Sequence, residues 1–122
     1  MNLTLPWPPA DLSPNRRLHW ARLAMAKRAY RDACHLSTLT TKSATERRSL
    51  PSGPLSLAME FRPPDRRTYD RDNLLARCKA GLDGMCDALG IDDRRFASVT
   101  VRVGEPALDG LVRVTIAQEV TP

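Results

Sequence analysis

An alternating segment between Leu55 and Phe61 constrains the fold of this chain more than any other part of the sequence. Successive side chains of a strand point to opposite faces, so apolar residues at every second position predict a strand with one buried face. The Pro-Pro pair at 63–64 ends this strand, because proline cannot donate to a sheet ladder. A helix follows from about Asp72 to Leu89, where apolar residues recur every three or four positions.

The glycines of this second helix carry information of their own. Gly90 directly follows the last apolar position and suits the left-handed residue that commonly ends a helix. Gly81 and Gly84 lie inside the helix, where glycine costs stability but lets another backbone come close.

Cys78 and Cys86 fall on the apolar face. With an odd cysteine count and no C-x-x-C pair, we interpret the three cysteines as small buried hydrophobes rather than zinc ligands.

The N-terminal half predicts one further strand and one further helix. Residues 2–6 alternate and read as a short strand. Residues 16–39 are rich in good helix formers, with Ser13 or Asn15 as candidate caps. Residues 37–53 are polar and rich in Ser and Thr, which is typical of a fraying helix end and a flexible loop. The core-facing stripe of the helix is expected to comprise Trp20, Leu23, Ala24, Tyr30 and Cys34.

Two further alternating runs, 99–103 and 112–116, flank a turn region and look like a hairpin. The element order is then β-α-β-α-β-β. We therefore expect an α+β fold in which residues 1–122 form a single domain, with one mixed sheet and two helices.

Charge favours a polyanionic partner. The formal net charge is +5, and such an excess promotes binding to phosphates with release of counterions. The charged face of the first helix is either simply solvated or lies along a phosphate backbone, and the sequence leaves both open. No apolar run reaches membrane-spanning length and no signal peptide is recognisable, so we expect a cytoplasmic protein without a membrane partner.

Acidic residues stand inside this basic sequence at two places. Asp70 and Asp72 lie between the end of the predicted strand and the start of the second helix, and Asp92-Asp93 follows that helix. Carboxylates are the ligands that Mg²⁺ prefers, and Mg²⁺ assists phosphodiester hydrolysis. Helix capping, for which Asp72 qualifies, is the competing explanation for one of the first pair. A helix of this length would also hold the two acidic pairs apart unless the loops fold back.

Several motifs occur together in the order typical of one family: Leu5-Pro6-Trp7-Pro8-Pro9, Asn15-Arg16, Ala29-Tyr30-Arg31, Pro64-Asp65-Arg66-Arg67, Asp70-Arg71-Asp72-Asn73-Leu74 and Asp92-Asp93. In these motifs the chain resembles RusA-type Holliday junction resolvases, which phages and prophages often carry. The resemblance implies a homodimer acting in DNA recombination and repair. It implies an endonuclease that resolves four-way junctions by symmetric paired nicks with Mg²⁺, or Mn²⁺ in its place, and no small-molecule cofactor.

The resemblance also implies roles for individual residues. Asp70 and Asp72 match the metal-binding pair of the family, and Asp93 matches its third carboxylate. The family usually has a lysine four residues after the second Asp, where this chain has Ala76. Lys79 lies one helical turn further on the same face, so we favour it as the catalytic cation over the adjacent Arg77. If neither side chain reaches the site, the chain is a weak or inactive branched-DNA-binding module; a flap or branched-DNA nuclease is the other alternative.

Contacts to the DNA backbone are expected from basic and polar residues on both sides of the acidic pairs. Arginine suits this role because its planar guanidinium can bind a phosphate through two donors. The candidates are Asn15, Arg16, Arg17, Arg28, Arg31, Arg66, Arg67, Arg71, Arg77, Arg94 and Arg95.

Overall fold

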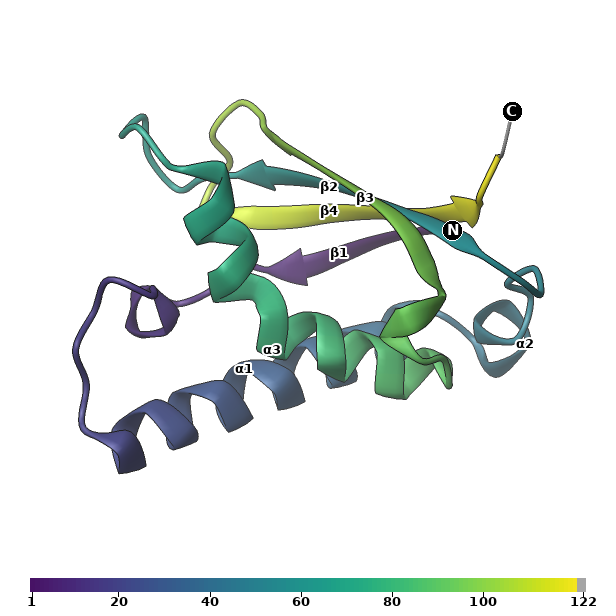
Figure 1. The fold of residues 1–122 in the computed structure, drawn as a ribbon, viewed down its shortest axis with the longest axis horizontal. Helices are drawn as coiled ribbons and strands as arrows, with labels where there is room; N and C mark the ends of the chain where they lie inside the picture. The colour runs from purple at the N-terminus through teal and green to yellow at the C-terminus, as the bar shows by residue number, and fades with distance from the viewer. Residues whose placement is uncertain (121–122) are drawn as a thin grey trace.

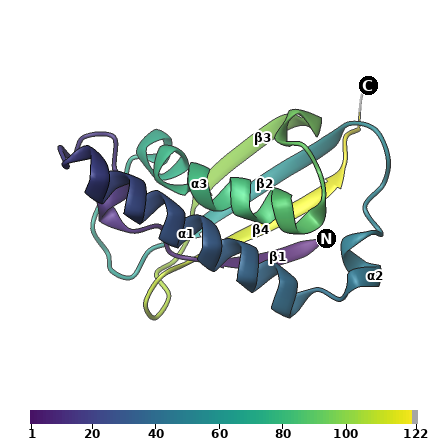
Figure 2. The same ribbon diagram turned by 90° about the horizontal axis from the view of Figure 1, so that it is seen from below.

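The alternating segments pair into one four-stranded mixed sheet, and two long helices cover one of its faces (Figure 1, Figure 2). The structure is a computed structural model that describes residues 1–120, so the last two positions of the expected domain lie outside the described residues. The predicted fold class, a single α+β domain, is confirmed. The elements are β1 (Asn2–Pro6), the 3₁₀ turn η1 (Ala10–Leu12), α1 (Trp20–Thr41), α2 (Ala44–Arg47), β2 (Leu55–Arg62), α3 (Arg71–Leu89), the 3₁₀ turn η2 (Asp93–Arg95), β3 (Phe96–Val103) and β4 (Leu111–Gln118).

The strands lie in the order β1-β4-β2-β3. β4 is antiparallel to both of its neighbours, whereas β2 and β3 are parallel and are joined by α3. Leu55, Leu57, Met59 and Phe61 of β2 are all buried, which suits a strand paired on both sides. β1 and β3 are the two edge strands, and most residues of β3 are exposed.

The predicted hairpin between 99–103 and 112–116 is wrong, because β2 lies between β3 and β4. The connection after β3 crosses the end of β2, where the Gly104 N–H donates to the Phe61 carbonyl at 2.8 Å. The Ala107 N–H then donates to the Pro63 carbonyl at 2.9 Å. Placing β2 in the centre buries its continuous apolar face, which a local β3–β4 pairing would leave at an edge.

α1 begins four residues later than expected. His19 caps it, because the His19 Nδ1 accepts from the Ala21 N–H at 3.2 Å, so neither Ser13 nor Asn15 is the cap. Of the predicted core stripe, Tyr30 and Cys34 are buried, but Trp20 is 77% exposed and Ala24 is exposed as well. The reason is that the first turns of α1 extend beyond the ends of the strands (Figure 1).

The segment predicted as a loop is partly helical. α1 continues to Thr41, and α2 follows with a capping box between Ser43 and Glu46.

The three cysteines are free and buried, as predicted. None of the helices between residues 1 and 120 is long and apolar enough to cross a membrane.

The two long helices touch at the glycines of α3, as their positions predicted. A Cβ atom added to Gly84 would lie 2.1 Å from the Arg31 carbonyl oxygen of α1. One added to Gly81 would lie 2.4 Å from the Tyr30 ring. Real Cβ atoms do not come this close to their neighbours, so α1 can pack here only against glycine.

We expect Gly84→Ala to destabilise the protein by about 1–3 kcal/mol, the usual cost of overpacking. Alanine is the better helix former by about 1 kcal/mol, but the Arg31 carbonyl belongs to a backbone that cannot rotate away. Urea denaturation of the variant and wild type gives the difference. A Gly84→Ala variant as stable as wild type would contradict the close helix packing.

Candidate active site

Asp70 caps α3 at the end of the loop that joins β2 to this helix. Its Oδ1 accepts from the Asp72 N–H at 2.8 Å and from the Asn73 N–H at 3.1 Å. The expectation that Asp72 caps the helix is therefore wrong, because α3 starts at Arg71 and Asp72 already lies in its first turn. Both carboxylates are exposed. Capping uses one oxygen of Asp70 and leaves Oδ2 for another ligand.

A groove of about 410 Å³ runs between α3 and the β3 edge of the sheet. Its floor is apolar, and four charged side chains border it. The apolar lining is Leu57, Leu75, Ala76, Leu82, Phe96 and Val99, and the charged lining is Asp72, Lys79, Asp83 and Asp93. Three carboxylates and one ammonium group thus share a concave surface in a chain of net charge +5.

The structure separates the two members of the second acidic pair. Asp92 caps η2 by accepting from the Arg94 N–H at 2.9 Å, and its carboxylate forms an ion pair with the Arg94 guanidinium at 3.3 Å. Hydrogen bonds from the backbone and side chain of Arg94 lower the pKa of Asp92. Asp93 instead borders the groove. Of the two, Asp93 is the one that borders this groove.

Lys79 and Arg77 point to different sides of α3. Lys79 borders the groove together with Asp72 and Asp93. Arg77 donates to the Pro8 carbonyl at 2.6 Å, and its guanidinium lies 5.6 Å from the Trp7 ring centroid. Burial lowers the pKa of Arg77, and its Nε has no hydrogen-bond partner among the described residues. Lys79 is therefore the cation that belongs to this groove, and Arg77 fixes the N-terminal segment to α3.

The carboxylates fit Mg²⁺ in chemistry but are spread along the groove. Within residues 1–120, no three His, Cys, Asp or Glu side chains gather closely enough to hold a metal ion. α3 has 19 residues, which corresponds to about 28 Å at 1.5 Å per residue. Asp70 lies before its first residue, whereas Asp93 follows its last turn, so the concern about the separated acidic pairs is confirmed within one chain.

Asp83 was missed by the sequence reasoning. It borders the same groove and lies one turn after Lys79 on the same face of α3. The positions 72, 76, 79 and 83 follow the i, i+4, i+7, i+11 spacing of a single helix face. The sequence reasoning placed Asp72 and Lys79 on one face of the helix; following that face for one more turn would have identified Asp83.

The arginines predicted to bind DNA divide into three groups. Five form ion pairs with neighbouring carboxylates: Arg16 with Asp11, Arg31 with Asp87, Arg66 with Glu105, Arg67 with Asp65, and Arg94 with Asp92. Two donate to backbone carbonyls, Arg77 to Pro8 and Arg95 to Gly53. Among the described residues, no ion pair involves Arg17, Arg28 or Arg71.

The Asp65–Arg67 pair is the tightest of these contacts in the loop before α3. The Arg67 guanidinium and backbone N–H both donate to the Asp65 carboxylate, at 2.7–3.0 Å. Together with the Tyr69 hydroxyl they lower the pKa of Asp65 to about 2. Asp65 therefore stays ionised down to strongly acidic pH and shapes the loop that leads to Asp70.

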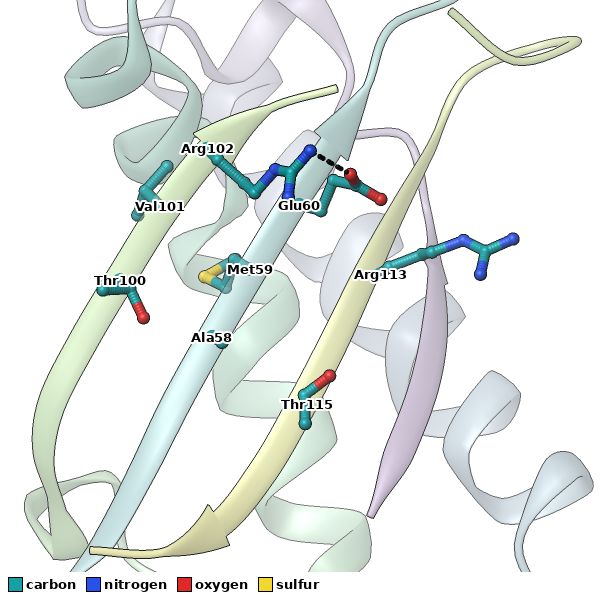
Figure 3. A pocket seen from close by; sticks show the side chains of 8 residues that line it. All are labelled: Ala58, Met59, Glu60, Thr100, Val101, Arg102, Arg113 and Thr115. Atoms are coloured by element: carbon teal, nitrogen blue, oxygen red, sulfur yellow. Dashed lines mark ion pairs between the residues drawn. The ribbon is translucent and has the colours of Figure 1, made fainter. Parts of the chain in front are cut away.

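A second hollow, of about 420 Å³, lies on the open face of the sheet (Figure 3). The residues around it are mostly small, hydroxylic or basic. Its one carboxylate, Glu60, forms an ion pair with Arg102 at 3.2 Å, and Arg113 points away from them. This hollow has no second acidic group among its lining residues, so the α3–β3 groove is the better candidate for metal-assisted chemistry.

Comparison with known proteins finds a relative that matches most of the chain. No family model matches the sequence. An uncharacterized protein of Xylella fastidiosa is 45% identical over 116 residues, which span 94% of this chain and 74% of that protein. The chain therefore belongs to the same family as that Xylella fastidiosa protein.

We expect replacements of Asp70 to separate its capping role from its charge. Asp70→Ala removes the cap and should lower the free energy of unfolding by about 1 kcal/mol, whereas Asp70→Asn keeps a capping oxygen and should cost a few tenths at most. Urea denaturation of both variants checks this. Equal loss of stability in the two variants would show that the charge, and not the cap, matters for folding.

Proposed function

We propose that this chain is a Mg²⁺-dependent endonuclease that resolves four-way DNA junctions by symmetric paired nicks. The observation that carries the proposal is the groove that Asp72, Asp83, Asp93 and Lys79 border on a protein of net charge +5. A protein that only grips phosphates gains nothing from carboxylates at its surface, whereas a metal-dependent nuclease requires them. The motifs shared with RusA-type resolvases support the choice of substrate, and the cytoplasm is the proposed location.

By the family resemblance, Asp70, Asp72 and Asp93 would hold Mg²⁺; Asp72 and Asp93 border the groove, and Asp70 lies next to Asp72 at the start of α3. When bound, Mg²⁺ neutralises phosphate charge and activates water for attack on phosphorus. The water oxygen would bond to phosphorus in line with the P–O3′ bond. As the P–O3′ bond breaks, O3′ takes up a proton, which leaves a 5′-phosphate and a 3′-hydroxyl. Lys79 supplies positive charge next to the developing charge on the phosphate.

The edge strand supports the proposed homodimer. β3 has eight residues and pairs on one side only. Val99 and Val103 are 46% and 38% exposed, and Arg102 is the one charged residue of the strand. Long edge strands with few charges are normally covered or protected. A second copy at this edge would bury the valines, lie beside the groove, and give two sites related by the two-fold symmetry that a junction has.

We expect the wild-type protein to cut a labelled four-way junction in Mg²⁺ or Mn²⁺ and to stop when the metal is chelated. Asp70→Asn, Asp72→Asn and Asp93→Asn should each lose at least 100-fold in cleavage rate and still bind the junction. Lys79→Ala should lose about 10²–10³-fold, the usual cost of one group that stabilises developing charge. Gel assays with end-labelled strands give the rates and the symmetry of the nicks.

Asp109→Asn and Lys42→Ala are the matched controls, since neither residue borders the groove, and both should cut at the wild-type rate. Binding without cleavage in any divalent metal would favour the non-catalytic module. Cleavage of flaps with intact junctions would favour a different branched-DNA nuclease.

We expect a molecular mass near twice 13.6 kDa in sedimentation equilibrium. Val99→Lys with Val103→Lys should shift the protein toward the monomer, because the charges would have to be buried against the second copy. Thr115→Lys, on the open face of β4, is the control and should remain dimeric. A double variant that dimerises as well as wild type would exclude the β3 edge as the interface.

A further inference from the structure

The start of α1 carries an exposed indole. Trp20 is its first residue and is 77% exposed, whereas the other Trp, Tyr and Phe side chains of the described residues are buried or half-buried. A full indole contributes a large apolar surface to any contact that covers it. The sequence pattern assigned Trp20 to the core, and the structure leaves it without a partner in the sheet.

The position of Trp20 is well defined by its neighbour. The rings of His19 and Trp20 lie 5.5 Å apart between centroids, with planes inclined by 32°. His19 is held in turn by the hydrogen bond from the Ala21 N–H to its Nδ1. The two rings lie next to each other at the tip of the helix, with their planes tilted.

The surroundings of this surface are basic. Five basic residues and no acidic one lie between Ser13 and Ala29: Arg16, Arg17, Arg22, Lys27 and Arg28. Asp11 is the one carboxylate that pairs with them, through Arg16 at 3.4 Å and Arg22 at 3.5 Å. No ion pair within residues 1–120 involves the remaining three. Positive charge beside an exposed aromatic ring is the combination with which proteins bind unpaired nucleotides, since rings stack on bases and cations bind phosphates.

The tip also lies at the appropriate end of the molecule. In both views α1 and α3 begin toward the same end (Figure 1, Figure 2). Asp70 caps α3 at that end. A nucleic acid bound there can therefore contact the tip of α1 while its backbone extends toward the acidic pair.

We propose that Trp20, supported by His19, is a stacking platform for an unpaired base of branched or single-stranded DNA. Arg17, Lys27 and Arg28 bind the phosphates on either side of that base. The inference rests on the DNA-binding part of the proposed function and is independent of cleavage. A stacked base contributes about 1–3 kcal/mol, which corresponds to about 5- to 150-fold in affinity.

The test uses the full chain with chelator present, so that cleavage plays no part. The chain has two tryptophans, and Trp7→Phe leaves Trp20 as the sole indole. Its fluorescence should be quenched by an unlabelled single strand and by a four-way junction with an unpaired base at the branch. A closed dumbbell duplex of equal length should quench it far less.

Affinity measurements separate stacking from general contact. Trp20→Ala should weaken binding to the single strand by about 5- to 150-fold and binding to the dumbbell by less than twofold, whereas Trp20→Phe should restore most of the loss. Met25→Ala is the matched control, because Met25 is also on α1 and 73% exposed, and it should bind within twofold of wild type.

Two results would overturn the platform: unchanged Trp20 fluorescence at saturating DNA, or equal losses for dumbbell and single strand. Conversion of a dimer to a monomer by Trp20→Ala would also overturn it, since a second copy would then cover the indole. Quenching by branched DNA in a protein that never cuts would support the platform and exclude the nuclease, so the two proposals fail separately.

Discussion

The contact between α1 and α3 is the constraint on which the rest of the structure depends. It brings the backbone of α1 against Gly84 and the Tyr30 ring against Gly81, so the helices cross at a distance that no larger residue permits. Tyr30 extends this contact to the sheet, because its hydroxyl donates to the Pro6 carbonyl of β1 at 2.7 Å. Burial raises the pKa of Tyr30, so the hydroxyl keeps its proton and remains a donor. One side chain thus ties both helices to β1.

The position of α3 in turn determines what faces the groove. Once Gly81, Cys78 and Met85 are buried against α1 and the sheet, the opposite stripe of the helix must face the edge strand β3. That stripe contains Asp72, Lys79 and Asp83. The burial of the apolar face therefore places the charged residues along the groove, while the length of the helix keeps the acidic groups from gathering in one chain.

The sequence predicted the positions of the helices and strands better than the pairing of the strands in the sheet. Strand alternation and helix periodicity are local, and they located β2 and α3 within a residue or two. Strand pairing is not local, so two consecutive alternating runs were taken as a hairpin although β2 separates them. Trp20 was misplaced for a related reason, since helix periodicity identifies a face but not where the sheet beneath it ends. In the candidate site, Lys79 was preferred to Arg77 by helix geometry, and Asp83 was missed because the comparison stopped one turn early.

The ion pairs of the predicted DNA-binding arginines decide which of them can exchange a protein partner for a phosphate. Exposed ion pairs contribute only about 0–1 kcal/mol, so Arg16, Arg66 and Arg94 give up little stability when a phosphate replaces a carboxylate. Arg77 and Arg95 differ, because they are half-buried and their guanidinium groups hold the backbone at Pro8 and Gly53. Moving Arg77 would leave the carbonyl of the buried Pro8 without this donor, which costs about 1–3 kcal/mol, and moving Arg95 would release its contacts to the Pro51 and Gly53 carbonyls. We therefore assign Arg77 and Arg95 a structural role, because moving them costs stability. The arginines in exposed ion pairs can bind phosphate instead, because they lose little when they leave their carboxylates.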